Sequence, residues 1–350
     1  MTSIEDLVHE WEGEEVLLRY EPSLETWIFI SIHSTRLGPA GGGTRILTYS
    51  TPAEGLADGM KLAGAMTRKM AVAGLPFGGG KAVLAVPAIP QGDERLRLLE
   101  AYASAINSLH GTFHTATDIN STEEDMNILS TMSRFIHGKG PAFGGFGSSG
   151  PPTAVGVFHG IRASVEHVFG SRSLEGRSVL IQGVGGVGEH LAELLREDGA
   201  ELILCDIAEE KVRGLAERLG ARVIEPGSEI ETETDVFAPC AMGGLISSDT
   251  VDRLACKIVA GSANNQLADP EAAEALRKRG ILYAPDYVIN SGGAIHLIGL
   301  EVLRWEKDEY EKHLEGVGDT LLSIYRTADA KGITTVTASE RLVEDRLAAG

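Results

Sequence analysis

The sequence is poor in cysteine and in long apolar stretches, and each shortage excludes a class of protein. Its three cysteines are scattered without the spacing of metal ligands. An odd number of such cysteines is typical of buried free thiols, so we expect neither disulfide bonds nor a metal site. No apolar run approaches the roughly 18 residues that span a bilayer. The acidic N-terminal stretch also lacks the basic and apolar pattern of a signal peptide, so we expect a cytoplasmic protein.

Basic residues are also few. The sequence has 31 lysines and arginines against 50 aspartates and glutamates, which gives a formal net charge of -19. Nucleic acids and anionic membranes need clustered positive charge on a protein that binds them, so we expect neither as a partner. The hydrophobic fraction of 43% and the charged fraction of 23% are those of an ordinary globular protein.

Two domains fit the length of 350 residues and the pattern along the chain. Alternating apolar and polar residues between positions 15 and 47 predict strands, and apolar residues at helical spacing predict a helix over 51–70. Strand and helix patterns alternate up to about residue 140, where a stretch rich in Gly, Pro and Ser breaks them. We predict a first domain at 1–145, a second at 146–325, and a C-terminal helix at 326–350 that returns to the first.

Two predicted helices begin with residues that cap helix N-termini. Thr51 and Pro52 are a cap and a first-turn residue for the helix at 51–70. Ser121 and Glu124 have the spacing of a capping box, which predicts that another helix begins there.

Lys69 and Lys81 lie in the stretch Gly64–Val83, which has almost no other charge between them. An ammonium group in apolar surroundings must pair with an anion or lose its proton. Each lysine is therefore a candidate anion clamp or a candidate neutral base. The three glycines before Lys81 leave room for a ligand or for another backbone. A triphosphate-binding loop is excluded, because Ala82 stands where such a loop needs a hydroxyl.

A glycine-rich motif opens the second predicted domain. A β-type run at 177–182 leads into Gly183-Val184-Gly185-Gly186-Val187-Gly188, and a helical pattern follows. These glycines permit a tight turn, close approach of a pyrophosphate and close packing of the helix. Asp206 ends the next predicted strand, about 20 residues further on, where a carboxylate binds ribose hydroxyls and repels a 2′-phosphate. The motif predicts a doubly wound Rossmann domain that binds NAD through Gly183, Gly185, Gly186, Val187, Gly188, Asp206 and Ile207.

Three further β-type runs end in small or amide residues. The carboxyl ends of strands in a doubly wound sheet border the ligand site. We therefore expect Ala241, Ala263, Asn264 and Asn290 at the edge of that site, with the first three close to the cofactor.

Seven segments together carry a resemblance that extends over nearly the whole chain. They are, in order, GPAGGGTR, GAMTRKMAVAGLPFGGGKAVL, TATDIN, PTAVGV, QGVGGVG, AGSANNQ and ILYAPDYVINSGGAIHL. The chain resembles the amino acid dehydrogenases of the Glu/Leu/Phe/Val group, and its motifs look most similar to those of phenylalanine dehydrogenases. We expect two α/β domains, the first with a mixed sheet, and a cleft between them. The resemblance implies reversible, NAD-dependent oxidative deamination of an L-amino acid to a 2-oxo acid and ammonium.

The resemblance also implies roles for matching positions. Lys69 matches the lysine that binds the substrate carboxylate, Lys81 the catalytic lysine, and Asp118 the acidic partner of the amino group. A second cation and a dry cleft lower the pKa of a lysine, which suits Lys81 as a general base. The other matching positions are Ser149 and Thr153 near the nicotinamide, Asn264 at cofactor and substrate, and Gly41 and Gly42 at the substrate.

The expected side chain of the substrate is aromatic. Leucine dehydrogenases typically carry leucine at the position of Gly41, and the missing isobutyl group leaves room for a ring. L-Phenylalanine or another aromatic amino acid is therefore the expected substrate, with leucine or valine as the alternative. Thr117 and Ser291 depart from the family pattern and leave this preference open. His114, close to Asp118, is the one histidine that we single out as a candidate site residue.

Two other functions share features with this pattern. A 2-hydroxy acid dehydrogenase would usually have a histidine base and an arginine anchor, whereas lysines occupy these roles here. A catalytically silent NAD-binding sensor is the second alternative, and the joint presence of Lys69, Lys81 and Asp118 argues against it. An exposed edge strand in the first domain predicts a homo-oligomer, a dimer or larger.

Overall fold

The structure, a computed structural model, describes residues 4–349, and the chain divides into two compact units. Unit 1 comprises Met1–Ser148, Leu297–Arg304 and Arg346–Gly350, and unit 2 comprises Ser149–His296 and Trp305–Asp345. The segment Leu297–Arg304, which lies inside the predicted second domain, therefore belongs to the first unit. Its Glu301 carboxylate accepts hydrogen bonds from the backbone of Gly138, at 3.1 and 3.2 Å, which attaches the segment there.

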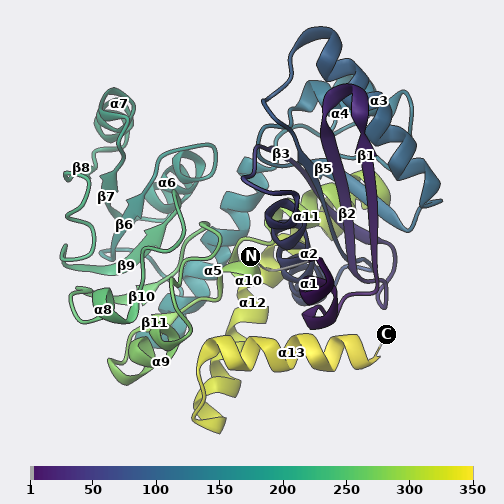
Figure 1. Cartoon of the computed structure of the whole chain (residues 1–350). Helices are drawn as coiled ribbons and strands as arrows, with labels where there is room; N and C mark the ends of the chain where they lie inside the picture. Colours follow the sequence, from purple (N-terminus) through teal and green to yellow (C-terminus); the bar gives the residue numbers. More distant parts are fainter. Residues whose placement is uncertain (1–3, 350) are drawn as a thin grey trace. The chain divides into compact units, whose positions relative to one another are not determined.

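Unit 1 is built on a five-stranded mixed sheet in the order β1-β2-β4-β3-β5 (Figure 1). β1 and β4 run antiparallel to β2, whereas β4 and β5 run parallel to β3. The mixed sheet of the first domain is thus confirmed. The strands are β1 (Glu15–Glu21), β2 (Thr26–Ser34), β3 (Ala40–Leu47), β4 (Gly78–Ala85) and β5 (Phe113–Thr117).

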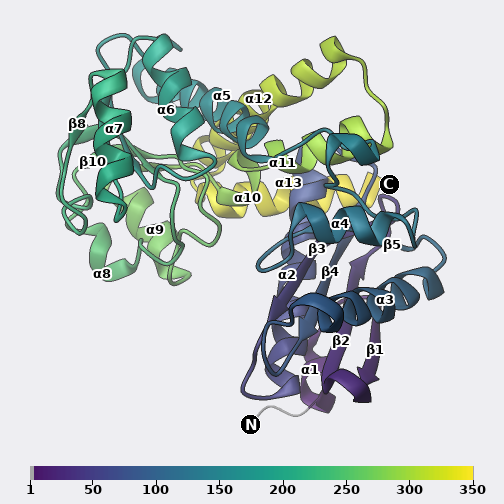
Figure 2. The ribbon, with the colours of Figure 1, turned by 90° about the horizontal axis from the view of Figure 1, so that it is seen from above.

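Helices cover both faces of this sheet (Figure 2). The helix α2 (Pro52–Ala73) packs on one face, over a core that includes Phe29 and Val83. The helices α3 (Gly92–Ser108) and α4 (Glu123–Ser130) cover the other face, where Tyr102 and Phe113 are buried. The remaining helical elements of unit 1 are α1 (Ile4–Glu10), the 3-10 turns η1 (Pro22–Leu24) and η2 (Pro141–Phe143), and the π-helical turn η3 (Leu297–Val302).

The stretch with the two lysines comprises the end of α2, a turn at Gly74 and the start of β4. A Cβ atom at Gly79 would lie 2.1 Å from the backbone nitrogen of Thr67. Glycine is therefore required there for α2 to lie close to the sheet. Of the two expected uses of the glycine triplet, close approach of another backbone is confirmed.

One of the two predicted helix caps is correct. The Thr51 side chain accepts a hydrogen bond from the backbone of Glu54 and α2 begins at Pro52, as predicted. The capping box predicted at Ser121 and Glu124 is wrong, because α4 is capped one residue later by Thr122 with Asp125. The Ser121 hydroxyl instead donates to the carbonyl of Thr44, at 2.6 Å.

Unit 2 contains a six-stranded parallel sheet in the order β11-β10-β9-β6-β7-β8. This order reverses direction beside β6, as in the doubly wound fold that binds dinucleotides, so the predicted Rossmann domain is confirmed. The strands are β6 (Ser178–Gln182), β7 (Glu201–Cys205), β8 (Arg222–Val223), β9 (Thr234–Pro239), β10 (Cys256–Val259) and β11 (Leu282–Tyr283).

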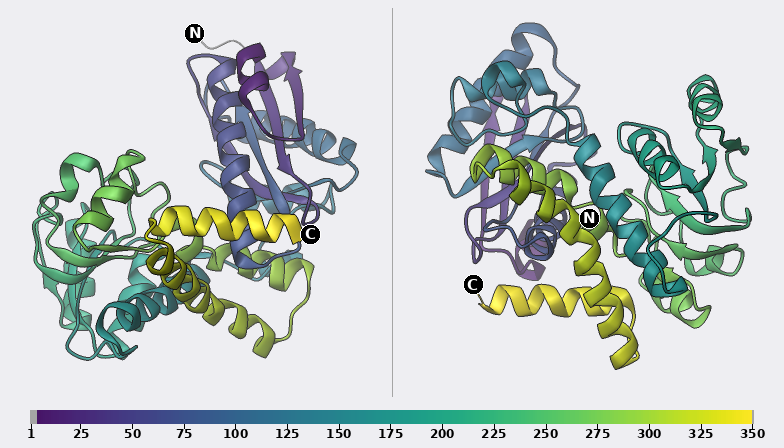
Figure 3. Two further views of the ribbon diagram at one scale, coloured as in Figure 1. Left: turned by 90° about the horizontal axis from the view of Figure 1, so that it is seen from below. Right: turned by 180° about the vertical axis from the view of Figure 1, so that it is seen from behind.

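The longest helices of unit 2 are α5 (Gly150–Phe169) and α12 (Lys307–Lys331), which lie side by side (Figure 3). The Ser164 and Tyr325 hydroxyls join them through a buried hydrogen bond of 2.8 Å. The other helices are α6 (Gly188–Glu197), α7 (Glu209–Leu219), α8 (Ser248–Val251), α9 (Glu271–Lys278), α10 (Asp286–Ile289), α11 (Gly292–His296) and α13 (Thr335–Ala349). No helix between residues 4 and 349 has the length and apolar character to cross a membrane.

Candidate active site

Lys81 and Asp118 form an ion pair across the sheet of unit 1. Lys81 is on β4 and Asp118 directly follows β5, and β3 lies between these two strands. Their side chains meet above Gly43, where a Cβ atom would lie 2.9 Å from Asp118 Cβ and 3.3 Å from Lys81 Nζ. The Nζ–Oδ2 distance is 3.1 Å. The structure therefore brings together the two residues predicted to be catalytic, and it does so over a glycine.

Arg45 is a further member of this cluster that the sequence did not reveal. Its Nε donates to the same Oδ2 of Asp118 at 2.7 Å, and its Nη1 donates to Oδ2 of Asp58 at 2.9 Å. The hydroxyl of Tyr49 donates to this Asp58 oxygen at 2.7 Å. Two carboxylates and two cations thus alternate, with the tyrosine at the end. Alternation of Gly41, Gly43 and Arg45 along β3 was the available signal, since side chains two apart share a face.

Burial and neighbouring charges act on the pKa values of the pair in opposite directions. Burial and the charge of Arg45 lower the pKa of Lys81, against the raising effect of Asp118. Burial alone would raise the pKa of Asp118, but the two cations lower it on balance. Only 5% of Lys81 is exposed, so its ammonium form has little hydration. The geometry thus combines a firmly ionised carboxylate with a lysine that gives up its proton more easily than usual.

The loop after β5 fixes the position of Asp118. The backbone nitrogen of Asp118 donates to the Ser121 hydroxyl at 2.8 Å. The Asn120 side chain donates to the carbonyl of Ile46 at 3.0 Å. The first bond lies within the loop, and the second, with the bond from Ser121 to the Thr44 carbonyl, attaches the loop to β3. Thr117, the unusual neighbour of Asp118, is on the opposite face of β5, because successive side chains of a strand alternate.

Lys69 is half-buried on α2, five positions before Gly74. It lies eleven positions after Asp58, about three helical turns, and therefore on the same side of α2 as this carboxylate. The adjacent Met70 has its Cε 3.1 Å from the position of a Cβ atom at Gly41. Lys69 is thus at the Gly41 end of the face that carries Lys81 and Asp118.

Gly41 and Gly42 lie on opposite faces of β3. A Cβ atom at Gly41 would be 3.1 Å from both Met70 Cε and Phe77 Cδ1, which are the ends of side chains. A Cβ atom at Gly42 would lie 1.8 Å from the carbonyl oxygen of Gly80. The space beside Gly41 is therefore on the face of the ion pair, and Gly42 serves the packing of the sheet.

The glycine-rich turn in unit 2 has the geometry that was expected from its spacing. Gly183 has a φ of +95°, and a Cβ atom there would lie 2.7 Å from Ala241 Cβ. A Cβ atom at Gly188 would lie 1.9 Å from the carbonyl oxygen of Gly183. Above Gly185 and Gly186 there is open space. The turn thus allows α6 to begin close to β6 and leaves its backbone accessible to an anion.

Asp206 follows β7 directly and borders this turn. Its Oδ2 accepts a hydrogen bond from the backbone of Val184 at 2.7 Å, and its Oδ1 accepts one from Ala208 at 2.8 Å. Each oxygen keeps a lone pair for a hydroxyl donor. Ile207 follows β7 and Met242 follows β9, the two strands that flank β6, and they are 91% and 79% exposed. Apolar side chains, an accepting carboxylate and a free helix N-terminus together fit a dinucleotide such as NAD.

The other predicted cofactor residues form two groups in unit 2. Val187 precedes α6, and Ala241, Ala263 and Asn264 follow the carboxyl ends of β9 and β10. Asn290 donates to the Asn264 side chain at 2.8 Å. At the start of α5, the Thr153 hydroxyl donates to the carbonyl of Ser149 at 2.7 Å. These two residues contact Gly293, where a Cβ atom would lie 2.9 Å from Thr153 Oγ1.

Ser291, which departs from the family pattern, is buried and donates its hydroxyl to the carbonyl of Val288 at 2.7 Å. Its hydroxyl therefore has a hydrogen-bond partner within its own helical segment and does not need one from a ligand.

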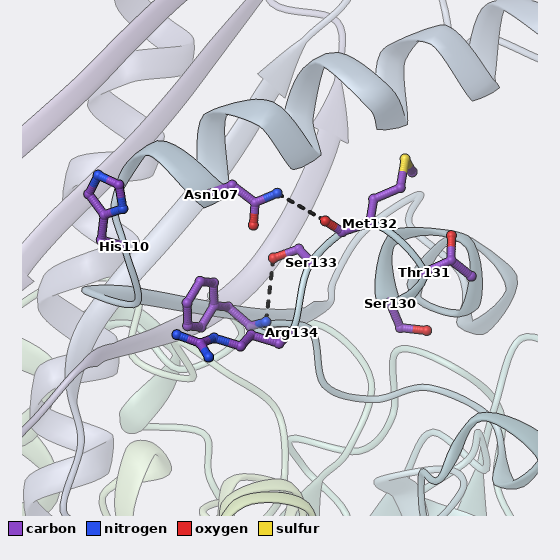
Figure 4. Close-up of a pocket in the computed structure, with 8 residues that line it drawn as sticks. Asn107, His110, Ser130, Thr131, Met132, Ser133 and Arg134 are labelled. Carbon is purple, nitrogen blue, oxygen red and sulfur yellow. Dashed lines mark hydrogen bonds between the residues drawn. The ribbon is translucent and has the colours of Figure 1, made fainter.

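A separate hollow of about 460 Å³ lies on the surface of unit 1, between the end of α3 and the segment that follows α4 (Figure 4). Asn107 donates to the carbonyl of Met132 at 2.9 Å across it. Its lining contains none of the predicted site residues. It comprises Asn107, His110, Ser130, Thr131, Met132, Ser133, Arg134 and Phe135.

Comparison with known proteins identifies the family. Residues 26–134 match the model of the Glu/Leu/Phe/Val dehydrogenase dimerisation domain, and residues 201–349 match that of Glutamate/Leucine/Phenylalanine/Valine dehydrogenase. The chain belongs to the Glu/Leu/Phe/Val dehydrogenase family. It is therefore an amino acid dehydrogenase, an oxidoreductase that acts on a CH–NH2 group, and its cofactor is NAD, as predicted.

Individual relatives extend over the whole chain. A leucine dehydrogenase of Thermoactinomyces intermedius is 39% identical, over 98% of this chain and 93% of that protein. A valine dehydrogenase of Streptomyces coelicolor is 40% identical, over 98% of this chain and 94% of its own. The crystal structure of L-tryptophan dehydrogenase from Nostoc punctiforme is similar with a TM-score of 0.86 at 37% identity, and covers 99% of this chain and 100% of its own.

Proposed function

We propose that the protein catalyses the reversible, NAD-dependent oxidative deamination of a hydrophobic L-amino acid to its 2-oxo acid and ammonium. The observation that carries this proposal is the buried Lys81, whose Nζ lies 3.1 Å from Asp118 and whose pKa is lowered by burial and by Arg45. A dehydrogenase of this kind needs a neutral base in a dry site, because water must attack the imine that is formed when the substrate loses hydride.

In this proposal four charged residues of unit 1 have one task each. Lys69 binds the substrate carboxylate and Asp118 binds the ammonium group, so the α-carbon is held between them. Lys81 removes a proton from the water that attacks the imine. Arg45 keeps Asp118 ionised, so that this carboxylate is an acceptor when the amine arrives. In unit 2, the Gly183–Gly188 turn and Asp206 would hold NAD, which accepts the hydride.

An aromatic side chain is the best candidate for the substrate. Gly41, Gly43 and Ala116 present little side-chain volume on the face that carries Lys81. Met70 and Phe77 border this space with apolar atoms. A branched aliphatic substrate is the second candidate, since relatives 39% and 40% identical are a leucine and a valine dehydrogenase.

The test is the initial rate of NADH formation at alkaline pH across L-Phe, L-Trp, L-Tyr, L-Leu, L-Val, L-Ile and L-Glu. We expect an aromatic amino acid to have the highest kcat/KM. A higher kcat/KM for L-Leu or L-Val would refute the proposal of an aromatic substrate, whereas the proposed oxidative deamination would still stand. Binding of NAD without oxidation of any of these substrates would favour the silent sensor.

The role of Lys81 has its own test. Lys81→Ala should lower kcat by about 10²–10⁴-fold, the range for loss of a general base, while NAD affinity measured by fluorescence stays the same. Lys61→Ala is the matched control, because Lys61 is exposed on α2. Turnover by Lys81→Ala within a few-fold of the unmodified enzyme would contradict the assignment.

A homo-oligomer is proposed on the basis of the edge strand. β1 pairs with β2 alone among the described strands, and Leu18 and Tyr20 are 42% and 46% exposed on it. Unpaired edges of this kind readily add another strand. Sedimentation equilibrium should therefore give a mass of at least twice 37.1 kDa. A monomer at micromolar concentration would refute this proposal.

A further inference from the structure

Three buried or half-buried side chains of unit 1 lie in a row that the proposed chemistry does not use, joined by one hydrogen bond and one longer polar contact. His114 Nδ1 lies 2.8 Å from His137 Nε2, and His137 Nδ1 lies 3.6 Å from Glu301 Oε2. The Glu301 side chain is 1% exposed and also accepts hydrogen bonds from the backbone of Gly138. A buried carboxylate next to two imidazoles is costly unless the groups serve each other, so the row fixes the orientation of both rings.

His114 lies on the face of β5 that also carries Asp118. Side chains two positions apart share a face, so His114, Ala116 and Asp118 form one line. In the sheet His114 is level with Gly41 of β3, and Ala116 is level with Gly43. The line therefore leads from the amino-group partner, past a methyl group and two glycines, to an imidazole ring.

The surroundings of His114 are aromatic and apolar. The ring of Phe77, which borders the space beside Gly41, meets the His114 ring edge-on with centroids 5.3 Å apart. Phe135 meets it from another direction, also at 5.3 Å. Burial and the neighbouring His137 lower the pKa of His114 to about 4. The ring is therefore neutral at the pH at which a dehydrogenase works.

We propose that His114 is a specificity-determining residue, which forms the far wall of the substrate side-chain site and selects an aromatic over a branched aliphatic side chain. This inference rests on the proposed function and names the substrate class of that same site. His137 and Glu301 are positioning residues in it, because they hold the His114 ring in one orientation.

The distances along the strand support an aromatic substrate. Ala116 lies about 7 Å and His114 about 13 Å along β5 from Asp118, at roughly 3.3 Å per residue. A leucine side chain bound with its amino group at Asp118 ends near Ala116. A phenyl ring extends further and reaches the His114 ring. Two aromatic rings in contact attract each other beyond the burial of their area, and an aliphatic group gains no such term.

The test is the ratio of kcat/KM for L-Phe to kcat/KM for L-Leu. This ratio is independent of the fraction of folded enzyme, so a loss of stability does not change it. His114→Leu should lower the ratio by about five-fold, as expected for the loss of one aromatic contact. His114→Phe keeps a ring and should hold the ratio within about two-fold of the unmodified enzyme. His9→Leu, at an exposed position on α1, is the matched control.

His137→Leu tests the positioning role. It leaves the His114 ring in place but without its hydrogen-bond partner, so the ratio should fall by less than in His114→Leu. An unchanged ratio in His114→Leu would overturn the proposal, and an unchanged ratio in His137→Leu would overturn the role of the row. If the unmodified enzyme oxidised none of the seven amino acids of the panel described above, the proposed function itself would be refuted, and this inference with it.

Discussion

Replacement of Arg45 by methionine tests whether the charge of Arg45 lowers the pKa of the proposed base, Lys81. Arg45 Nε and Lys81 Nζ contact the same oxygen of Asp118, at 2.7 and 3.1 Å. The two cations therefore lie at most about 6 Å apart. At an effective dielectric constant of about 20, their repulsion is about 3 kcal/mol, and it disfavours the charged form of Lys81.

The sign of the effect follows from the role of a base. Arg45 lowers the pKa of Lys81, so its removal raises that pKa. A general base acts in its unprotonated form, and activity therefore rises as pH increases through its pKa. Arg45→Met should therefore move the acidic limb of the kcat/KM profile to higher pH, by less than the full repulsion implies, because Arg45 is partly hydrated and its charge is partly screened.

The assay is kcat/KM for the preferred amino acid at closely spaced pH values, with NAD saturating. Arg45→Lys is the control, because it keeps the charge but loses the planar pair of nitrogens that bridges Asp118 and Asp58. We expect its limb to stay near that of the unmodified enzyme, although its rate falls. If the acidic limb of the kcat/KM profile of Arg45→Met stayed at the original pH and only the maximum kcat/KM fell, Arg45 would order Asp118 without affecting the pKa of Lys81. This result would refute the reasoning.

Three further substitutions test the rest of the site. Gly43→Ala places a Cβ atom 2.6 Å from the Thr117 carbonyl oxygen, so kcat should fall by about 100-fold or more, as for a misplaced reacting group; a near-normal kcat would contradict this. Asp206→Ser should raise kcat/KM with NADP relative to NAD at least ten-fold, whereas an unchanged ratio would remove the carboxylate from cofactor selection. Arg346→Met loses hydrogen bonds of 2.7 and 2.6 Å to the carbonyls of Ala71 and Val72 near the end of α2. The free energy of unfolding, measured with urea, should therefore fall by about 1–3 kcal/mol.

Some of the site was predictable because its signal is local. The turn from Gly183 to Gly188 has fixed spacing, and its strand before and helix after were readable as patterns. Lys81 was a candidate base from its apolar surroundings alone, but Asp118 was found only through a family resemblance, since nothing local indicates that two residues 37 positions apart in the sequence become neighbours.

Arg45 could not be predicted because its partners are set by the order of strands. It contacts Asp118, 73 positions away, only because β3 lies between β4 and β5. The alternation along β3 showed which residues share a face, but not which strands flank them. A second cation was expected to lower the pKa of Lys81, and Arg45 has this effect.

The error at Ser121 and the unexpected η3 have related causes. The sequence pattern at Ser121 satisfies the rule for a cap, but the hydroxyl is used by the Thr44 carbonyl of a distant strand. Tertiary contacts thus displaced the start of α4 by one residue. The helix propensities of the residues do not distinguish a π-helical turn at Leu297–Val302 from an α-helix. The place of this turn in unit 1 depends on the contact of Glu301 with Gly138.

The meeting of Lys81 and Asp118 above Gly43 has a consequence for engineering. Their separation is set by the backbone hydrogen bonds that space β4, β3 and β5, and these follow a repeat of about 4.8 Å between neighbouring strands. The spacing of the strands thus sets the distance between the reacting groups. In contrast, the space for the substrate is bordered by side chains on α2 and after its C-terminal turn, such as Met70 and Phe77. Substitutions at these two positions can therefore retune which amino acid is accepted while the chemistry keeps its spacing.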